Sequence, residues 1–442
     1  MSRLVSFLVT SALFVCGTKA TAATLQVGPG KAYAAPCGAI AAAAAGDTIE
    51  IDASGNYAGD VCGWTTNGLT LRGIGGRAKI DAAGRNAQGK AIWVISGNDT
   101  IVENVEFTGA AVPDLNGAGI RAEGRNLTIR NGYFHDNQEG ILGGAGDVLI
   151  EYSEFARNGN CIDPSGCAHN IYIANCNSFT LRFSYSHSAK DGHLVKSRAA
   201  TNYILYNRLT GEADGTESYE IDLPNGGTSY VIGNLIEQGP NTGNSAMLAY
   251  REEGGTAGNP GTDLYVVNNT FVNDRGSGTF VQPTTPTPAV IVNNIFAGGG
   301  TVTSQANAVQ TTNYSGPAPM LVDPVNYDYR LQAGAPCVNA GSDPGMGGAF
   351  SLMPIYEYVH PLSGETRNAV GAIDCGAYEL GGAGTPLDGG SLPTPDGGMA
   401  SVVPSSGCSS RVPMGPTDAA WIFGVTVAVW LAIRRRRGAR QR

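Results

Sequence analysis

The sequence is poor in charged and aromatic side chains. Charged residues make up 15% and aromatic residues 8% of the 442 residues, and five histidines are present. A net charge of −9 argues against a nucleic-acid partner, and no dinucleotide or phosphate-loop motif stands out. The nine cysteines contain no C-x-x-C pair, so they do not predict zinc. What remains informative is the two ends of the chain and the repeats between them.

The first 22 residues have the pattern of a signal peptide. Arg3 gives a basic start, residues 4–15 form an apolar stretch, and residues 20–22 (Ala-Thr-Ala) offer small side chains for cleavage. We therefore expect the protein to be exported.

The C-terminal end predicts a surface anchor. Residues 381–407 form a Gly/Pro/Ser-rich linker, and Cys408 follows within "GCSS". The tail 408–442 then contains the hydrophobic segment 419–433, which is short for a spanning helix, and the cluster "RRRR", which favours the cytoplasmic side. This order of parts resembles the MYXO-CTERM sorting tail of myxobacterial surface proteins. The resemblance implies that a sorting peptidase removes the helix and that Cys408 carries the anchor; the alternative is a plain membrane anchor. Either way the body lies outside the cytoplasm, on the cell surface at the outer membrane or secreted.

The cysteines of the body agree with export, because exported proteins can keep disulfides. The economical pairings are Cys37–Cys62, Cys161–Cys167 and Cys337–Cys375, which leaves Cys176 over. The sequence alone cannot fix this connectivity.

The body, residues 24–380, is built from a repeat. Helical periodicity is absent, glycine is abundant (63 residues), and short β-branched strands such as "RNLTIRNGYF" and "TSYVIGNLIE" recur, each with a polar or small residue, often Asn, before a second apolar pair. That position falls at Gly73, Asn104, Asn131, Tyr152, Phe183, Asn207, Asn234, Asn269 and Asn294. Successive positions differ by 31, 27, 21, 31, 24, 27, 35 and 25 residues. Steps this irregular favour a coil with loops of varying size over helical repeats or propeller blades.

The repeat predicts an all-β fold, a single-domain right-handed parallel β-helix of about ten coils, because each coil is too small to bury its own core and must stack on the next. The ends of such a stack need covers, and "AIAAAAAG" (39–46) is expected to be a short N-terminal capping helix. One inward column is expected to contain Ile129, Ile150, Leu181, Leu205, Ile232, Val267 and Val292.

At this point the chain resembles the pectate-lyase-like β-helix superfamily over roughly residues 24–380. A second resemblance lies in "LVDPVNYDYRLQAGAPCVNAGSD" and "GAIDCGAYE", which look like the closing block of many secreted bacterial β-helix proteins. Both imply a fold and a family, not a chemistry.

One outward column concentrates charge. Because strand side chains alternate between faces, Ile171, Val195 and Ile221 are expected to point inward, and Tyr172, Lys196 and Asp222 outward. The offsets of 24 and 26 residues correspond to one coil each, so these three side chains are expected on consecutive coils. Further outward or edge residues around them are expected to be Asn170, Arg198, Glu220, His169 and His193.

This cluster predicts carbohydrate chemistry. Lyase chemistry on a uronic acid polymer needs a base, a group that neutralises the substrate carboxylate and often an acid. The candidate catalytic residues are Lys196, as the base, with Arg198, Tyr172, His193 and His169; Asn170, Arg121 and Arg251 are expected to bind substrate. Glu220 and Asp222 are candidates for a Ca²⁺ site that neutralises the carboxylate.

The alternatives stay open at this stage. Epimerisation begins with the same proton abstraction, and Glu220 with Asp222 would also suit hydrolysis by a carboxyl pair. The paired-aspartate and Gly-His-Gly signatures of polygalacturonases are missing. A non-catalytic surface protein that binds glycan or matrix is a further alternative, because of the anchored tail. We expect a monomer whose partners are an acidic polysaccharide and the sorting peptidase.

Overall fold

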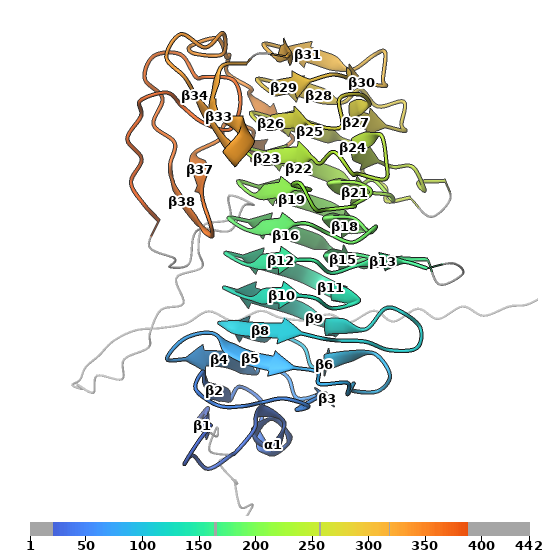
Figure 1. The fold of residues 1–442 in the computed structure, drawn as a ribbon, viewed down its shortest axis with the longest axis vertical. Coiled ribbons are helices and arrows are strands. Elements are labelled where there is room, and N and C mark those ends of the chain that lie inside the picture. Colours follow the sequence, from blue (N-terminus) through green and yellow to red (C-terminus); the bar gives the residue numbers. More distant parts are fainter. Residues whose placement is uncertain (1–20, 163–165, 256–257, 318, 388–442) are drawn as a thin grey trace, which may run out of the picture. The chain divides into compact units, whose positions relative to one another are not determined.

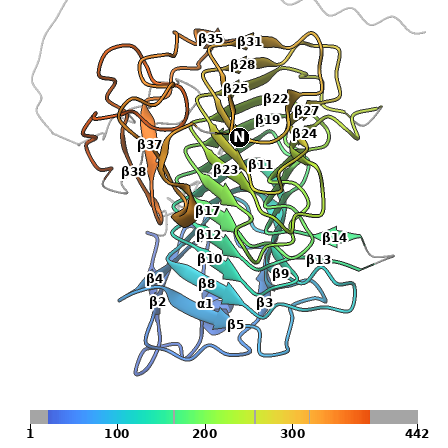
Figure 2. The same ribbon diagram turned by 45° about the horizontal axis from the view of Figure 1, so that its top comes forward.

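The computed structural model describes residues 21–162, 166–255, 258–317 and 319–387 (Figures 1 and 2). Most of the expected signal peptide and the whole expected anchor tail, with Cys408, lie outside these residues. Among the described residues, no helix is long and apolar enough to cross a membrane.

The body is a stack of coils whose strands pair in parallel with the next coil, so that three rows of strands run along the stack (Figure 1). Row A1 contains β1 (Thr24–Val27), β2 (Thr48–Asp52), β4 (Thr70–Ile74), β7 (Thr100–Glu103), the second halves of β9 (Ala118–Arg130) and β11 (Glu139–Glu151), β16 (Ser178–Arg182), β19 (Thr201–Leu205), β22 (Thr228–Ile232), β25 (Leu264–Val267), β28 (Val290–Val292) and β31 (Val309–Thr311). Row A2 contains β3 (Cys62–Trp64), β6 (Ala91–Ile95), the first halves of β9 and β11, β15 (Ile171–Ile173), β18 (Val195–Ser197), β21 (Ile221–Leu223), β24 (Ala246–Tyr250), β27 (Thr279–Pro283) and β30 (Thr301–Thr303).

Row B is the separate 10-stranded sheet, which agrees with the predicted coil number. Its strands are β5 (Ala78–Asp81), β8 (Val105–Thr108), β10 (Tyr133–His135), β12 (Glu154–Ala156), β17 (Tyr185–His187), β20 (Arg208–Thr210), β23 (Leu235–Gln238), β26 (Thr270–Asn273), β29 (Ile295–Gly298) and β32 (Tyr314–Gly316). The coils enclose one apolar column, in which Phe107, Phe134 and Phe155 stack with ring centroids 4.9 and 4.8 Å apart. Continuous apolar contact between coils replaces the core that a single coil lacks.

Buried amides stabilise the same bend in successive coils of the second half of the stack. The side chains of Asn207, Asn234, Asn269 and Asn294 form an asparagine ladder, in which each Nδ2 donates to the Oδ1 of the next over 2.9–3.0 Å. Each Oδ1 also accepts the backbone N–H of the preceding ladder residue. The ladder thereby satisfies backbone groups that the bend would otherwise bury unpaired.

The predicted inward column is correct for its first three members and wrong for the other four. The strand register pairs Leu181 with Ile204, and the column continues through Val231, Val266 and Ile291. The predicted residues Leu205, Ile232, Val267 and Val292 lie one position later and pack with Leu352 in a separate outer cluster. The difference of one residue begins after Phe183. Phe183 has a left-handed backbone (φ 51), and the equivalent position on the next coil is Tyr206 (φ 56), whereas the repeat predicts Asn207 there.

The N-terminal cover begins earlier than predicted. Helix α1 spans Pro36–Ala42, whereas 39–46 was expected, because Pro36 stands in its first turn, where proline needs no hydrogen-bond partner. All three economical disulfides, Cys37–Cys62, Cys161–Cys167 and Cys337–Cys375, are formed. Cys176 keeps a free thiol, and burial raises its pKa to about 12.

The coils end at β32, and residues 319–387 form a C-terminal segment beside the upper coils (Figure 1). Its elements are β33 (Leu321–Asp323), a 3-10 helix (Pro324–Asn326), β34 (Asp328–Leu331), β35 (Met346–Gly347), β36 (Phe350–Ser351), β37 (Tyr356–Val359) and β38 (Ser363–Thr366). Tyr230 Oη donates to Gly347 O over 2.8 Å, and Ile355 N donates to Tyr206 Oη over 3.1 Å. The block expected to close the stack thus covers its side.

Candidate functional site

The outward column predicted around Lys196 is present in row A2. Lys196 in β18 pairs in register with Tyr172 in β15 and with Asp222 in β21. The flanking residues Ile171, Val195 and Ile221 are buried in the core, as alternation requires. We call Tyr172, Lys196 and Asp222, with Arg198, His169 and His193, the Lys196 cluster.

Lys196 is held from both neighbouring coils. Its Nζ lies 3.2 Å from Asp222 Oδ2 and 5.4 Å from the centroid of the Tyr172 ring. The Lys196 side chain is only 12% exposed and that of Asp222 only 5%, so water screens the pair weakly. Burial opposes the charge of Asp222, but contacts with His193 and Lys196 outweigh it and lower the pKa of this carboxyl.

Arg198 ties the Tyr172 hydroxyl to an acidic loop. Its Nε donates to Tyr172 Oη over 2.9 Å, its Nη1 donates to Asn225 Oδ1, and its Nη2 lies 2.7 Å from Glu253 Oε2. Burial disfavours the cation, but Tyr172 and Glu253 outweigh burial and raise the pKa of Arg198. Since the Glu253 side chain is 54% exposed, a ligand carboxylate can replace it without a change in the core.

The two histidines are neutral hydrogen-bond donors. Their rings stack with centroids 4.4 Å apart. His169 Nδ1 accepts the N–H of His193 over 2.9 Å, and His193 Nδ1 accepts the N–H of Tyr219 over 3.2 Å. Burial is the main cause that lowers the pKa of both imidazoles. The proton of each ring therefore lies on Nε2, and His193 Nε2 stands 3.3 Å from Asp222 Oδ2. With Nδ1 occupied, neither ring offers a free lone pair to a substrate.

Two residues predicted to point outward point inward. Asn170 and Glu220 are fully buried, because each lies in the bend just before its strand, where alternation does not hold. Asn170 Nδ2 donates to Ser186 Oγ and to two backbone carbonyls. Neither carboxylate oxygen of Glu220 has a partner in the described structure, and burial raises its pKa well above the usual range.

The position of Glu220 does not fit the expected calcium site. Glu220 has the carboxyls of Glu217 and Glu237 as its charged neighbours, whereas Asp222 contacts His193 and Lys196, so the two carboxyls have different surroundings. The described residues also hold no group of three or more His, Cys, Asp or Glu side chains arranged for a metal.

The two predicted substrate-binding arginines, Arg121 and Arg251, differ in the hydrogen-bond partners of their guanidinium groups. Arg121 stands in the same outward column as Tyr172, with Leu142 between them. It is half-buried, its Nε is buried without a partner, and burial lowers its pKa. Arg251 instead donates to the carbonyls of Asn225 and Asn259 over 3.3 and 2.8 Å, so it braces a loop.

Sequence reasoning missed Glu139, which stands on the coil before His169 and His193 and begins their chain of hydrogen bonds. Its Oε1 accepts the N–H of His169 over 3.0 Å, and burial raises its pKa well above the usual range. Glu139, His169 and His193 precede Leu142, Tyr172 and Lys196 by three residues each, and these last three stand in one outward column. That constant offset was a signal that could have found it.

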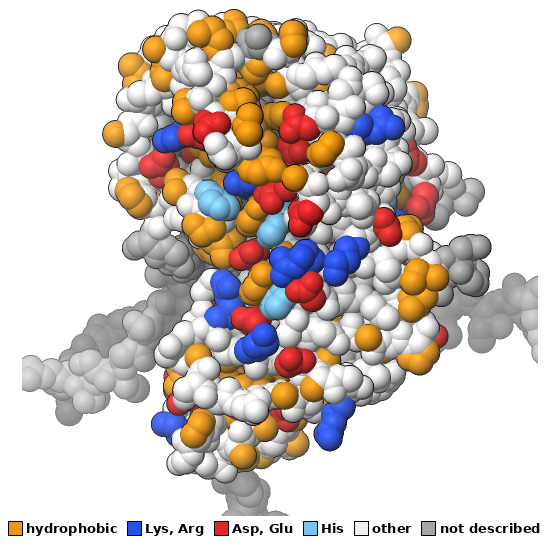
Figure 3. Space-filling view, in the orientation of Figure 1, with side chains coloured by type: hydrophobic (Ala, Val, Ile, Leu, Met, Phe, Trp, Pro, Cys, Tyr) orange, Lys and Arg blue, Asp and Glu red, His pale blue; other side chains and the backbone are white. Residues whose placement is uncertain are grey.

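A second polar surface, also missed, lies on row B. Figure 3 shows charged and histidine side chains gathered over this row. The motif Tyr-x-His occurs in β10 and β17, with the two rings of each motif stacked 4.3 and 4.0 Å apart. His135 Nε2 lies 3.1 Å from Glu106, and His187 Nε2 lies 3.3 Å from Glu154. The recurrence of "YFH" and "YSH" two coils apart was the available signal.

Comparisons with known proteins concern the fold. A family model described as "Right handed beta helix region" matches residues 60–182, and no curated protein sequence matches the chain. Pectate lyase Pel9A is 15% identical with a TM-score of 0.51, over 82% of this chain and 97% of that chain. The Dettilon tailspike protein (gp208) is 12% identical with a TM-score of 0.29, over 60% of this chain and 62% of its own. The PL6 family alginate lyase AlyGC is also 12% identical with a TM-score of 0.29, over 66% and 53%. The family match and the likeness to Pel9A, together with the parallel coils, establish the chain as a right-handed parallel β-helix.

Proposed function

We propose that the Lys196 cluster cleaves an acidic, uronate-containing polysaccharide by β-elimination. The observation that carries the proposal is the position of Tyr172 on an outward sheet face, where two cations of the next coil, Lys196 and Arg198, contact it. Arg198 donates to its hydroxyl, and Lys196 lies over its ring.

β-Elimination removes the proton next to the uronate carboxylate and expels the glycosidic oxygen. The sequence suggests Lys196 as the base, but its Nζ is engaged by Asp222 Oδ2 at 3.2 Å. We therefore give proton abstraction to Tyr172, acting as phenolate, because the Arg198 guanidinium can stabilise negative charge on Oη. Lys196, held as ammonium, donates a proton to the leaving oxygen.

The remaining residues position these two groups. Arg198 Nη2 takes the substrate carboxylate in place of the exposed Glu253, which neutralises the charge that opposes proton abstraction. Asp222 holds the Lys196 ammonium, and His193 Nε2–H holds Asp222. Arg121, with its unpartnered Nε, lies in the same column and is available to a second uronate.

The fold and the disulfides are compatible with this activity. Pel9A, a pectate lyase by its name, shares the fold, although fold alone does not determine function. Three disulfides are consistent with an extracellular protein, where a polysaccharide is available. We propose that the protein is exported and held at the cell surface through its C-terminal tail.

The test is an incubation of the purified protein with alginate, polygalacturonate and chondroitin, with a neutral glucan as the negative control. We expect new unsaturated chain ends, measured by ultraviolet absorbance, from at least one acidic polymer. Lys196→Ala should abolish them. The matched control is Lys79→Ala, because Lys79 also pairs with a carboxylate one coil on, at 3.2 Å from Glu106, but is 51% exposed.

Three outcomes would overturn the proposal and name its replacement. Binding of an acidic polymer without any cleavage would indicate a non-catalytic glycan-binding protein. A changed uronate stereochemistry without unsaturated ends would indicate an epimerase, and new reducing ends without unsaturation would indicate a hydrolase.

A further inference from the structure

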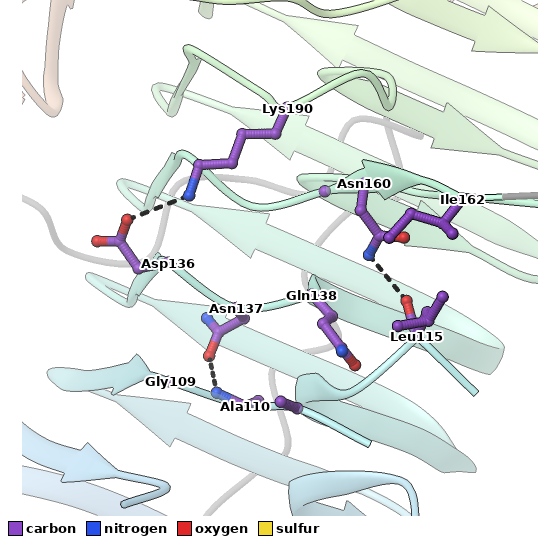
Figure 4. Close-up of a pocket in the computed structure, with 11 residues that line it drawn as sticks. Gly109, Ala110, Leu115, Asp136, Asn137, Gln138, Asn160, Ile162 and Lys190 are labelled. Carbon is purple, nitrogen blue, oxygen red and sulfur yellow. Dashed lines mark hydrogen bonds and ion pairs between the residues drawn. The ribbon is translucent and has the colours of Figure 1, made fainter. Parts of the chain in front are cut away.

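A pocket of about 320 Å³ opens at the bend between row B and row A2 (Figure 4). Four successive coils contribute to it, and the residues that matter are Leu115, Asp136, Gln138, Asn160, Ile162 and Lys190. Its volume lies in the range of small-molecule sites, about 300–1,000 Å³. The residue after Gln138 is Glu139 and Lys190 lies three residues before His193, so the pocket shares its coils with the Lys196 cluster.

Two polar groups in the pocket lack protein partners. Asn160 Nδ2 donates to Leu115 O over 2.9 Å, but Asn160 Oδ1 is buried without a partner in the described structure. Gln138 Oε1 accepts the N–H groups of Val112 and Gly117 over 2.8 and 2.9 Å, which leaves its Nε2 as a donor. An unmet acceptor and a donor in one pocket suit the hydroxyl groups of a sugar.

The charges at the pocket leave one cation in surplus. Asp136 accepts from Arg157 Nε and Nη2 over 3.1 and 2.9 Å and lies 2.8 Å from His135 Nδ1. Lys190 Nζ stands farther away, 3.6 Å from Asp136 Oδ1, and its side chain is 54% exposed. Arg157 already balances the single negative charge of Asp136, so the Lys190 ammonium is available to a carboxylate.

The rim of the pocket is apolar. Leu115 and Ile162 lie beside the polar groups (Figure 4), and the Ile162 side chain is exposed. Ile162 directly follows β13 (Asn160–Cys161), inside the hairpin that β13 forms with β14 (Cys167–Ala168) and that the Cys161–Cys167 disulfide closes. An apolar rim offers a surface for the C–H face of a sugar ring.

We propose that this pocket binds one uronate unit of the polysaccharide, with the sugar carboxylate at Lys190, its hydroxyls at Asn160 Oδ1 and Gln138 Nε2, and its ring against Leu115 and Ile162. The inference rests on the proposed function for its substrate class. It adds a second point of attachment on the same coils, which would fix the register of the chain at the Lys196 cluster.

The test measures binding, not turnover. Short oligosaccharides of alginate and of polygalacturonate, and their carboxyl methyl esters, are titrated by calorimetry into the full-length protein. The protein carries Lys196→Ala, so that no probe is consumed. We expect Lys190→Ala to weaken the acid form about tenfold or more, since it removes a charge-assisted contact. The protein with Lys190 intact should bind the ester about as weakly as Lys190→Ala binds the acid form. Lys190→Ala should not change the affinity for the ester, and Lys190→Arg should restore the affinity for the acid form. Lys79→Ala is the surface-lysine control and should change nothing.

Equal affinity of the parent and Lys190→Ala for the acid form would overturn the inference. So would an equal loss for acid and ester, or an absence of binding by any of the oligosaccharides. The two proposals fail separately. If the protein binds these probes through Lys190 but forms no unsaturated ends, the pocket is supported and the lyase activity is refuted. If it forms unsaturated ends at a rate that Lys190→Ala does not change, the lyase activity is supported and the pocket is refuted.

Discussion

Lys196 and Asp222 stand directly opposite each other on consecutive coils, with Nζ 3.2 Å from Oδ2. Lys79 and Glu106 repeat this arrangement on row B at the same 3.2 Å, but the Lys79 side chain is 51% exposed, whereas the Lys196 side chain is 12% exposed. The two ion pairs have the same distance but differ in burial, so a comparison of their contributions to the free energy of unfolding measures the effect of burial.

Removal of one partner should therefore cost more at the buried pair. We expect Asp222→Ala to lower the free energy of unfolding by about 3 kcal/mol, because it removes the buried carboxylate that Lys196 and His193 share. Combined with Lys196→Met, the loss should be smaller than the sum of the single losses. The corresponding cycle at Lys79 and Glu106 should give a coupling below about 1 kcal/mol. Denaturant unfolding measures both, and additive effects at Lys196 and Asp222 would contradict the expectation.

The column around Lys196 was predictable because coil length and strand alternation act together. Offsets of one coil place Tyr172, Lys196 and Asp222 in register. The same rule failed for Glu220, since β21 begins only at Ile221 and the residue before it lies in a bend. Some contact residues of the Lys196 cluster, such as Glu253, lie in loops of irregular length. The repeat in the sequence does not predict where such residues lie.

The slip in the inward column has a different cause. The left-handed corner of the coil is filled by Asn104 and Asn131 early in the chain, and by Tyr206 later. Later corners lie at Tyr206, Gly233, Asn268 and Asn293, each one residue before an asparagine of the ladder. Alignment of the repeats on those asparagines therefore shifts the expected inward column by one residue. The disulfides, by contrast, followed from sequence proximity alone, because stacked coils bring near neighbours in the chain close together.

The asparagine ladder should contribute strongly to stability. In the ladder Asn234 Oδ1 accepts from Asn207, and its Nδ2 donates to Ile204 O and Asn269 Oδ1 over 2.8 and 2.9 Å. Asn234→Ala leaves buried groups unpaired on both neighbouring coils and should cost about 3 kcal/mol in denaturant unfolding. Asn56→Ala is the matched control, since Asn56 makes a single exposed hydrogen bond. A loss at Asn234 no larger than at Asn56 would refute the role of the ladder.

The buried carboxyls predict that stability falls as pH rises. Burial raises the pKa of Glu237 to about 8 from its ordinary value of 4.5. Between these values the folded protein keeps a proton that the unfolded chain releases, so unfolding becomes more favourable with increasing pH. We expect Glu237→Gln to be more resistant to urea than the parent at about pH 9, with little difference at about pH 4. An equal dependence of stability on pH in the parent and in Glu237→Gln would contradict this.

The anchor prediction concerns residues outside the described part of the chain. The order "GCSS", hydrophobic segment and "RRRR" predicts that Cys408→Ala releases the protein from the cell surface or leaves its tail uncleaved. Cell fractionation and the mass of the mature protein measure the two effects. Unchanged retention and processing would favour a plain membrane anchor.

The final prediction separates the base from its neighbours. Tyr172→Phe removes only the hydroxyl, and it keeps the ring that Lys196 approaches at 5.4 Å. Arg198 retains Glu253 and Asn225 as partners, so we expect the fold and the affinity for acidic oligosaccharides to persist. The formation of unsaturated ends should fall by at least about a hundredfold, because proton abstraction loses its base.

Lys196→Ala tests the other half of the same assignment. If Tyr172 abstracts the proton, Lys196→Ala should retain cleavage of a substrate whose leaving group needs no proton, such as a uronate that carries an activated aryloxy group on C4, while Tyr172→Phe should lose it. Tyr172→Phe with full activity on both substrates would exclude Tyr172 as the base. Lys196, whose Nζ lies 5.4 Å from the centroid of the Tyr172 ring, would then be the next candidate for the base.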